Sequence, residues 1–199
     1  MNLIIPNKLP PAERSDLHLG YMRLSDSAPL IIAQELGLYA DYGLNVSLHR
    51  EVSWANIRDK MIAGTFDACQ MLAPMGMATT LGAAGIRAPI ISGLVLSLNG
   101  NGITLSSSLW NKLQIDTGAN TYDPLSTALA LKAEIDRTGQ QLTLASVHNF
   151  SIHTLLLHQW LELAGIDPDR DARIIVLPPE QMVDSLAQGI IDGFCVGEP

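Results

Sequence analysis

With 199 residues, 47% of them hydrophobic, the chain can bury a sizeable core and lacks the composition bias of disordered or collagen-like proteins. Its 12 Lys and Arg residues stand against 20 Asp and Glu, giving a formal net charge of -8. This charge argues against any general affinity for nucleic-acid phosphates or anionic membrane surfaces.

The N-terminus carries no recognisable export signal. Its apolar run at residues 3–5 is broken by Pro6, whereas a secretory signal needs about 7–15 apolar residues. Residues 88–98 form one of the longest apolar stretches, well short of the roughly 20 residues of a membrane-spanning helix. We expect a soluble cytoplasmic protein without membrane insertion, or a periplasmic or membrane-associated one if the natural start lies upstream.

The first half of the chain alternates strands with helices. Apolar residues alternate in the strands and recur every three or four residues in the helices. Ser53 is the expected cap of one helix and Gly64 its stop. We predict strands at 17–22, 44–49, 66–72 and 89–98, the last continuing into 103–105, and helices at 30–39, 53–63 and 75–81.

The second half repeats this order after a break in the pattern at residues 106–111. Alternating strands and helices with short connections predict parallel-rich sheets flanked by helices, an α/β fold in two lobes. The predicted helices are 126–137, 152–164 and 179–188, and the predicted strands are 142–147, 173–177 and 190–196.

The expected division of the chain follows from these elements. Residues 1–16 are an N-terminal tail, 17–108 the first part of the first lobe, 109–195 the second lobe, and 196–199 the start of a crossover back to the first lobe. Because the sequence stops just after an apolar strand, we expect a C-terminally truncated fold.

Ligands of open α/β sheets bind beyond the carboxyl ends of the strands, so residues in these places are candidates. Ser25 could hold a small anion, although helix capping alone explains it. Trp54 offers an N–H donor and a flat face for a planar ligand, and core packing explains it equally well. Asn101 lies in an Asn-Gly-Asn-Gly turn whose amides can donate, although such turns commonly form without a ligand.

Ser151 and His153 join a strand to a helix, near the positive end of the helix dipole. This is a candidate anion site, and a surface histidine without a partner is the alternative. Cys69 and Cys195 lie in apolar, strand-like surroundings without metal-type spacing, so we predict buried reduced thiols.

Motifs of enzymes are missing from the sequence. It contains no P-loop, no G-x-G-x-x-G after a strand, no G-x-S-x-G elbow and no H-E-x-x-H. The methionines of residues 71–77 are explained by core packing rather than by a metal. We therefore predict no catalytic residue, no metal site and no cofactor.

Six segments, in this order, resemble the nitrate/bicarbonate branch of the ABC-transporter solute-binding proteins. The likeness runs from about residue 17 to the last residue. The segments are Trp-Ala-Asn-Ile-Arg-Asp (54–59), Leu-Ala-Pro-Met (72–75), Leu-Asn-Gly-Asn-Gly (98–102), His153 with Trp160 and Ala-Gly-Ile-Asp-Pro (164–168), Leu-Pro-Pro-x-Gln-Met (177–182), and Asp-Gly-Phe-Cys-Val-Gly-Glu-Pro (192–199).

The resemblance implies a type II periplasmic-binding-protein fold that closes on nitrate, nitrite or bicarbonate. It places the anion contacts on Trp54, Asn101, His153 and the turn formed by Pro178 and Pro179. At Asn101 the nitrate-transport pattern has Gln, and before His153 it has Gly-Gly-Thr instead of Phe-Ser-Ile. The family also uses a basic residue beyond the Gly-Glu-Pro-Trp segment, after the end of this sequence.

The family likeness implies a non-catalytic function. Its cytoplasmic members look like nitrate or nitrite sensors that sequester an RNA-binding antiterminator, so we expect hinge closure on the anion to signal to a regulatory partner without direct nucleic-acid binding. The alternative is the receptor that delivers nitrate, bicarbonate or a sulfonate to an ABC permease. A third reading is an enzyme like those of thiamine-pyrimidine synthesis, which would need a reactive His with Cys or Lys in the cleft. Which anion binds stays open.

Overall fold

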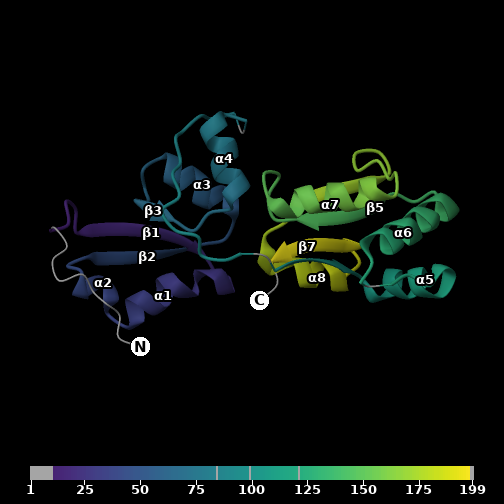
Figure 1. Ribbon diagram of the computed structural model, residues 1–199, viewed down its shortest axis with the longest axis horizontal. Helices are drawn as coiled ribbons and strands as arrows, with labels where there is room; N and C mark the ends of the chain where they lie inside the picture. Colours follow the sequence, from purple (N-terminus) through teal and green to yellow (C-terminus); the bar gives the residue numbers. More distant parts are fainter. Residues whose placement is uncertain (1–10, 84, 99, 121, 198–199) are drawn as a thin grey trace.

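The computed structural model describes residues 11–83, 85–98, 100–120 and 122–197, and these residues form two sheets (Figure 1). We call the half built on the three-stranded sheet, of order β2-β1-β3, lobe 1. Lobe 2 is built on the four-stranded sheet, of order β4-β7-β5-β6. The predicted α/β class, with parallel-rich sheets flanked by helices, is confirmed.

Lobe 1 is a parallel sheet with helices on both faces, α1 and α2 on one side and α3 and α4 on the other (Figure 1). Gly20 of the central strand is required, because a Cβ there would lie 2.4 Å from the Phe66 ring. The elements are β1 (Asp16–Met22), a short 3-10 helix η1 (Ser25–Ser27), α1 (Ala28–Glu35), α2 (Leu38–Asp41), β2 (Asn45–Glu51), α3 (Trp54–Ile62), β3 (Ala68–Cys69) and α4 (Ala73–Leu81).

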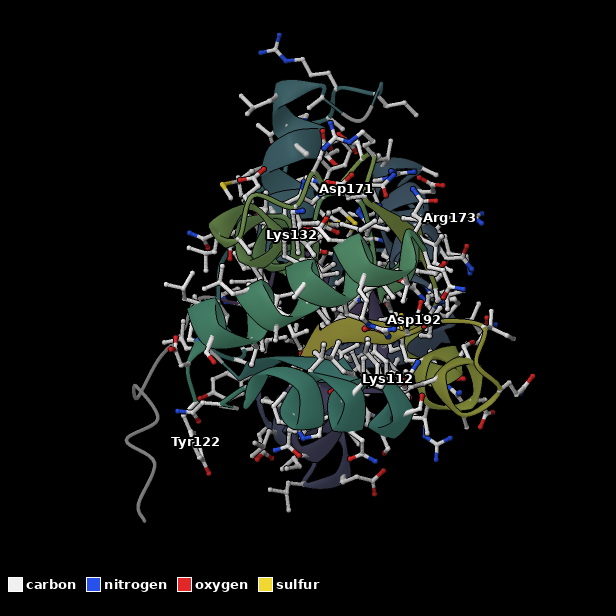
Figure 2. The ribbon with its side chains drawn as sticks, turned by 90° about the vertical axis from the view of Figure 1, so that its right-hand side faces the viewer. Lys112, Tyr122, Lys132, Asp171, Arg173 and Asp192 are labelled. Atoms are coloured by element: carbon white, nitrogen blue, oxygen red, sulfur yellow. The ribbon has the colours of Figure 1, made fainter. Side chains whose placement is uncertain are left out.

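Lobe 2 has three parallel strands and one antiparallel edge strand, β4, which pairs with β7. Figure 2 views this lobe from its outer end, where Lys112 and Lys132 project from α5 and α6. The elements are β4 (Asn101–Leu105), α5 (Ser107–Thr117), α6 (Pro124–Thr138), β5 (Leu142–Ser146), α7 (Ile152–Leu163), β6 (Ala172–Val176), η2 (Pro179–Gln181), α8 (Met182–Ala187) and β7 (Gly193–Gly197).

The predicted strand at residues 89–98 is wrong. Within the described chain, no backbone ladder joins these residues to another strand; Ile90 instead donates its N–H to Thr80 Oγ1 at 3.0 Å. Ile91 is 94% exposed, so the apolar alternation does not correspond to a buried face here. A strand is defined by its partner, and a local pattern cannot supply one.

The boundary between the lobes also differs from the expected one. Because β4 pairs with β7, residues 101–105 belong to the sheet of lobe 2 rather than to a first lobe ending at residue 108. The last strand stays in that sheet to Gly197, so the expected start of a crossover at residue 196 is still part of the strand. Among the described helices, none has the length and apolar character needed to cross a bilayer.

The two lobes meet through a shared hydrophobic cluster, which we call the junction cluster. Its buried members come from the strands of both sheets, from the segments next to them and from the helices α3, α4 and α8. They are Met22, Trp54, Ile57, Phe66 and Met75 of lobe 1 and Ala145, Val147, Met182, Ile191 and Phe194 of lobe 2. An ion pair between Arg50 and Glu180, 2.6 Å from Nη2 to Oε1, also links the lobes.

Candidate functional site

Trp54 lies in the junction cluster at the first position of α3. The helix begins there because the Ser53 side chain caps it, accepting the N–H of Asn56 at 3.2 Å. Trp54 is only 2% exposed, and its Nε1–H is buried without a hydrogen-bond partner in the described chain. An unpaired buried donor costs about 1–3 kcal/mol, so this indole is poised for an acceptor.

Gln70 is the second buried donor without a partner. It follows β3 directly, is 2% exposed, and accepts the Met22 N–H through Oε1 at 2.7 Å. Since a backbone N–H can only donate, this bond fixes which end of the amide is the oxygen. The amide nitrogen is buried and has no partner among the described residues.

The sequence prediction did not single out Gln70. A strand assigned to residues 66–72 placed it in a strand interior, whereas the ladder ends at Cys69. Gln70 could have been found from its residue type and position, because it is a lone amide between apolar residues at the end of a strand, where ligands bind.

His153 lies in the first turn of α7, a helix capped by Ser151 through the N–H of Thr154 at 3.2 Å. It is 6% exposed, and its Nδ1 lies 3.8 Å from the Cys195 sulfur on β7. Burial lowers the pKa of His153, and the negative charge of Asp26 in lobe 1 opposes this effect. Burial thus favours the neutral imidazole, and a charge of the other lobe acts on it.

His148 is a second buried histidine close to the junction. Its Nδ1 accepts the Phe150 N–H at 3.0 Å, which leaves Nε2 as the protonated nitrogen of the neutral ring. Burial is the largest cause that lowers its pKa, followed by the positive charge of Arg58, while the Phe150 bond and the charge of Asp59 raise it. Arg58 and Asp59 lie on α3, so charges of lobe 1 also affect the pKa of this histidine.

The other predicted residues lie in different surroundings. Ser151 is buried and caps α7, the capping role that serines in this position commonly have. Ser25 is exposed, and the buried serine of that turn is Ser27, which donates to the Leu24 carbonyl at 2.7 Å. Asn101 is exposed at the start of β4, and Pro179 is half-buried at the start of η2.

Two further predictions concern the thiols and the loop around Asn101. Cys69 and Cys195 are both free, Cys195 fully buried and Cys69 half-buried. Burial raises the pKa of Cys69 to about 11, so it is poorly suited to act as a nucleophile. The Asn99 part of the Asn-Gly-Asn-Gly turn lies outside the described residues.

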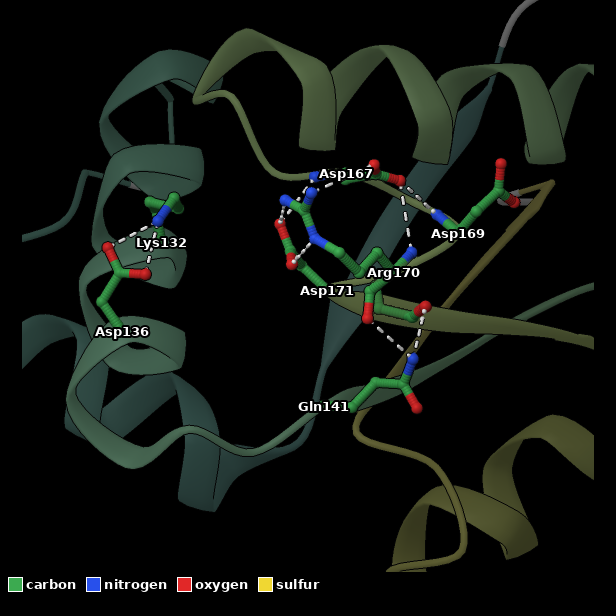
Figure 3. A network of polar contacts seen from close by, with 8 residues as sticks. Lys132, Asp136, Gln141, Asp167, Asp169, Arg170 and Asp171 are labelled. Carbon is green, nitrogen blue, oxygen red and sulfur yellow. Dashed lines mark hydrogen bonds and ion pairs between the residues drawn. The ribbon is translucent and has the colours of Figure 1, made fainter.

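An acidic run near the end of α7 is a structural turn rather than a ligand site. Figure 3 shows its polar network, in which Asp167 Oδ1 accepts the N–H of Asp169 at 3.0 Å and Arg170 pairs with Asp171. Gln141 Nε2 donates to the Arg170 carbonyl at 3.0 Å. The hydrogen bond from Arg170 lowers the pKa of Asp171 to about 2. In the described chain, no group of three or more His, Cys, Asp or Glu side chains could hold a metal ion.

A hollow of about 420 Å³ lies apart from the junction, in lobe 2 between α7 and β6, with His158 and Arg173 in its lining. It shares no residue with the junction cluster, and neither of the two buried unpaired donors borders it. The two unpaired donors both belong to lobe 1: Trp54 is a member of the junction cluster, and Gln70 is hydrogen-bonded to Met22, another member. An indole N–H and an amide N–H suit a small ligand rich in hydrogen-bond acceptors.

Comparison with known proteins gives consistent results. The model of the NMT1-like family matches residues 10–199. The bicarbonate transport ATP-binding protein CmpC of Synechococcus elongatus is 43% identical over 189 residues, covering 94% of this chain and 27% of that protein. The nitrate import ATP-binding protein NrtC of Synechocystis is 42% identical over 189 residues, again covering 94% of this chain and 27% of the relative.

A solved structure supports the same assignment. The crystal structure of the periplasmic nitrate-binding protein NrtA from Synechocystis PCC 6803 matches with a TM-score of 0.80 and 32% identity, over 94% of this chain and 48% of that chain. The alkanesulfonate-binding protein SsuA from Xanthomonas axonopodis, at 15% identity and a TM-score of 0.65, shares the fold. The chain thus spans 48% of the nitrate-binding protein NrtA and 27% of each of the two transport ATP-binding proteins.

Proposed function

The chain belongs to the NMT1-like family, and we propose that it is a non-catalytic binding domain that takes up nitrate or nitrite between its two lobes. The observation that carries this proposal is the pair of buried, unpartnered N–H donors, Trp54 Nε1 and Gln70 Nε2, at the junction. Relatives named as nitrate/nitrite-binding proteins, such as NrtA of Synechococcus elongatus at 37% identity, support the choice of ligand.

The chemistry of the junction fits a small planar anion. Nitrate offers three acceptor oxygens and no proton, which matches donors such as Trp54 Nε1 and Gln70 Nε2. The N-termini of α3 and α7, where Trp54 and His153 lie, add positive potential without a buried cation. Neutral donors of this kind bind an anion without titrating near pH 7.

Binding between the lobes provides a route to signalling. An anion that contacts residues of both lobes favours the closed arrangement by its differential affinity for the two states. Closure changes the outer surface that a regulatory partner binds. One candidate partner is an RNA-binding antiterminator. We therefore propose sensing rather than catalysis.

A second candidate function rests on the named relatives. CmpC and NrtC are called transport ATP-binding proteins, and the chain matches 27% of each. The domain would then be the anion-binding unit of an ABC transporter for nitrate or bicarbonate. A sensor changes its affinity for a regulatory partner when nitrate is added, whereas a transport unit associates with an ATPase or permease.

Isothermal titration of nitrate, nitrite, bicarbonate and sulfate tests the ligand. We expect nitrate or nitrite to bind the wild type, and Trp54→Phe to weaken binding by roughly 10- to 100-fold, because a hydrogen bond to a charged group contributes about 1.5–3 kcal/mol. Gln70→Glu places a carboxylate where the amide donates, so binding should be lost.

Trp110→Phe is the matched control, because Trp110 packs against the separate core of lobe 2. It should bind nitrate as the wild type does. Circular dichroism checks that each variant is folded. If none of the four anions gives a heat of binding, and an equilibrium method also detects no binding, the proposal is refuted and an organic ligand is indicated.

A further inference from the structure

The contact between Cys195 and His153 has no role in the function proposed above. Cys195 lies on β7 of lobe 2 and is 0% exposed, and its sulfur is 3.8 Å from Nδ1 of His153. Among the described residues, the other ring nitrogen of His153, Nε2, has no hydrogen-bond partner. The contact therefore decides which ring nitrogen is left for a ligand.

Both groups are neutral in their surroundings. Burial lowers the pKa of His153, with the charge of Asp26 acting in the opposite direction, and burial raises the pKa of Cys195 to about 12. A neutral imidazole has one N–H donor and one acceptor nitrogen, and a neutral thiol has one S–H. Only two arrangements are then available: S–H donates to Nδ1, or Nδ1–H donates to sulfur.

The first arrangement makes better use of both groups. Sulfur is a weak acceptor, whereas the unprotonated nitrogen of an imidazole is a good one. With the thiol proton directed at Nδ1, the ring proton must sit on Nε2. A second ring, His148, is held in the same tautomer by the Phe150 N–H, so it presents an Nε2 donor as well.

We propose that Cys195 fixes His153 as the Nε2–H tautomer, so that the ring offers a ligand a donor rather than an acceptor and favours an oxyanion that carries no proton. Nitrate fits this description, whereas bicarbonate carries an O–H that needs an acceptor. The two anions have the same charge and nearly the same planar shape, so their affinity ratio isolates the effect of that proton. The tautomer is inferred from the contact between Cys195 and His153 alone, whereas the selectivity for nitrate rests on the proposed function.

The charge of Asp26, in lobe 1, acts on His153. Its carboxylate repels both monoanions, yet it could accept the bicarbonate O–H. Selectivity set by Asp26 would favour bicarbonate, the opposite of the result expected here. Asp26→Asn therefore separates the two origins of selectivity.

Nitrogen NMR of the ligand-free protein, labelled with ¹⁵N in histidine, tests the tautomer. At pH 7.5 we expect His153 Nε2 to carry the proton in the wild type. Cys195→Ala should give a mixture of the two tautomers, and Cys195→Ser, which keeps a donor, should restore Nε2–H. Cys69→Ala is the matched control, since Cys69 lies in the other sheet, and it should leave the His153 signals unchanged.

A wild-type spectrum with the proton on Nδ1, or a Cys195→Ala spectrum identical to that of the wild type, would overturn the proposal. The wild-type result does not depend on whether any variant folds. It also does not depend on anion binding, so it separates the failure of this inference from the failure of the proposed function.

Titration of nitrate and bicarbonate then tests the selectivity. We expect Cys195→Ala to reduce the preference for nitrate about threefold to tenfold, the effect of weakening one hydrogen bond. A preference that changes only in Asp26→Asn would contradict the role of Cys195. If neither anion binds while the Nε2–H tautomer is present, the proposed function fails and the tautomer assignment stands.

Discussion

The two lobes bury their hydrophobic residues in different places. Lobe 2 has a core of its own, in which Leu131, Leu144, Leu157 and Leu161 from its sheet and helices are fully buried. Most of the buried hydrophobic residues of lobe 1 belong instead to the junction cluster, which they share with lobe 2. Lobe 1 therefore depends on its contact with lobe 2, and a ligand bound between them should stabilise lobe 1 more.

The exposed apolar surface of lobe 1 is concentrated in one region. Seven large exposed hydrophobic residues lie on α4 and the extended segment after it. They are Met77, Leu81, Ile86, Ile91, Leu94, Val95 and Leu98. Lobe 2 also exposes large apolar side chains, among them Leu155 and Val183, but it has a separate buried core to which Cys195 belongs.

Shortening a buried side chain in the lobe 2 core should have the largest effect on stability. Leu157 of α7 is fully buried, and Leu157→Ala should lower the free energy of unfolding by about 2–5 kcal/mol because it leaves a cavity. Urea unfolding followed by tryptophan fluorescence measures this loss. A loss below about 1 kcal/mol would mean that lobe 2 lacks a tightly packed core.

Shortening a buried side chain at the junction should affect the two lobes differently. Ile57 of α3 is fully buried in the junction cluster, so Ile57→Ala should cost about 2–4 kcal/mol. Hydrogen exchange should accelerate in β1 and β2 much more than in β5, since lobe 2 keeps its separate core. Equal acceleration in both sheets would contradict the dependence of lobe 1 on lobe 2.

Acidification should weaken the fold through the two buried histidines. Burial lowers the pKa of His148 and of His153 below the ordinary 6.5, so the unfolded chain binds more protons as the pH falls through that value. The free energy of unfolding should fall below about pH 6.5, by roughly 1.4 kcal/mol for each unit by which a pKa is lowered, until the pH passes the folded-state pKa.

Urea unfolding between pH 7.5 and pH 5 measures this dependence. The variants His148→Gln and His153→Gln should each flatten the curve, whereas His158→Gln, with a half-buried ring in the hollow between α7 and β6, serves as the control. A curve that both junction variants leave unchanged would assign the acid sensitivity to other groups.

The ion pair between the lobes should have the smallest effect. The side chains of Arg50 and Glu180 are 43% and 47% exposed, and exposed pairs contribute about 0–1 kcal/mol. A double-mutant cycle of Arg50→Ala and Glu180→Ala should give a coupling below 1 kcal/mol that disappears in 1 M salt. A larger, salt-resistant coupling would show that the pair, rather than the apolar cluster, holds the lobes together.

Local features of this fold were predictable from the sequence. The helices that follow Ser53 and Ser151 begin where their caps indicate, and the α/β order follows from apolar periodicity. Pairing was not predictable, because it depends on distant partners: β4 joins β7 across some ninety residues, and residues 89–98 lack a described partner strand.

The candidate site shows the same limit. Trp54 and His153 were singled out by their places after strands; the structure buries Trp54 in the junction cluster and His153 in the first turn of α7, and their role in binding stays a prediction. Gln70 was not singled out, because its free amide nitrogen depends on the bond that its oxygen makes to Met22, a residue 48 positions earlier. The Cys195 contact with His153 likewise joins two distant segments.

The central claim is that the lobes meet at a site whose buried donors receive an anion, and the three tryptophan side chains test it most directly. In ¹⁵N-labelled protein titrated with nitrate, the Trp54 indole N–H signal should shift strongly and saturate. The Trp160 signal should stay in place, because its Nε1–H already donates to the Pro124 carbonyl and to Thr127 Oγ1, each at 3.1 Å. A Trp54 signal that does not move at saturating nitrate, or that moves no more than the signal of Trp160, would contradict the account.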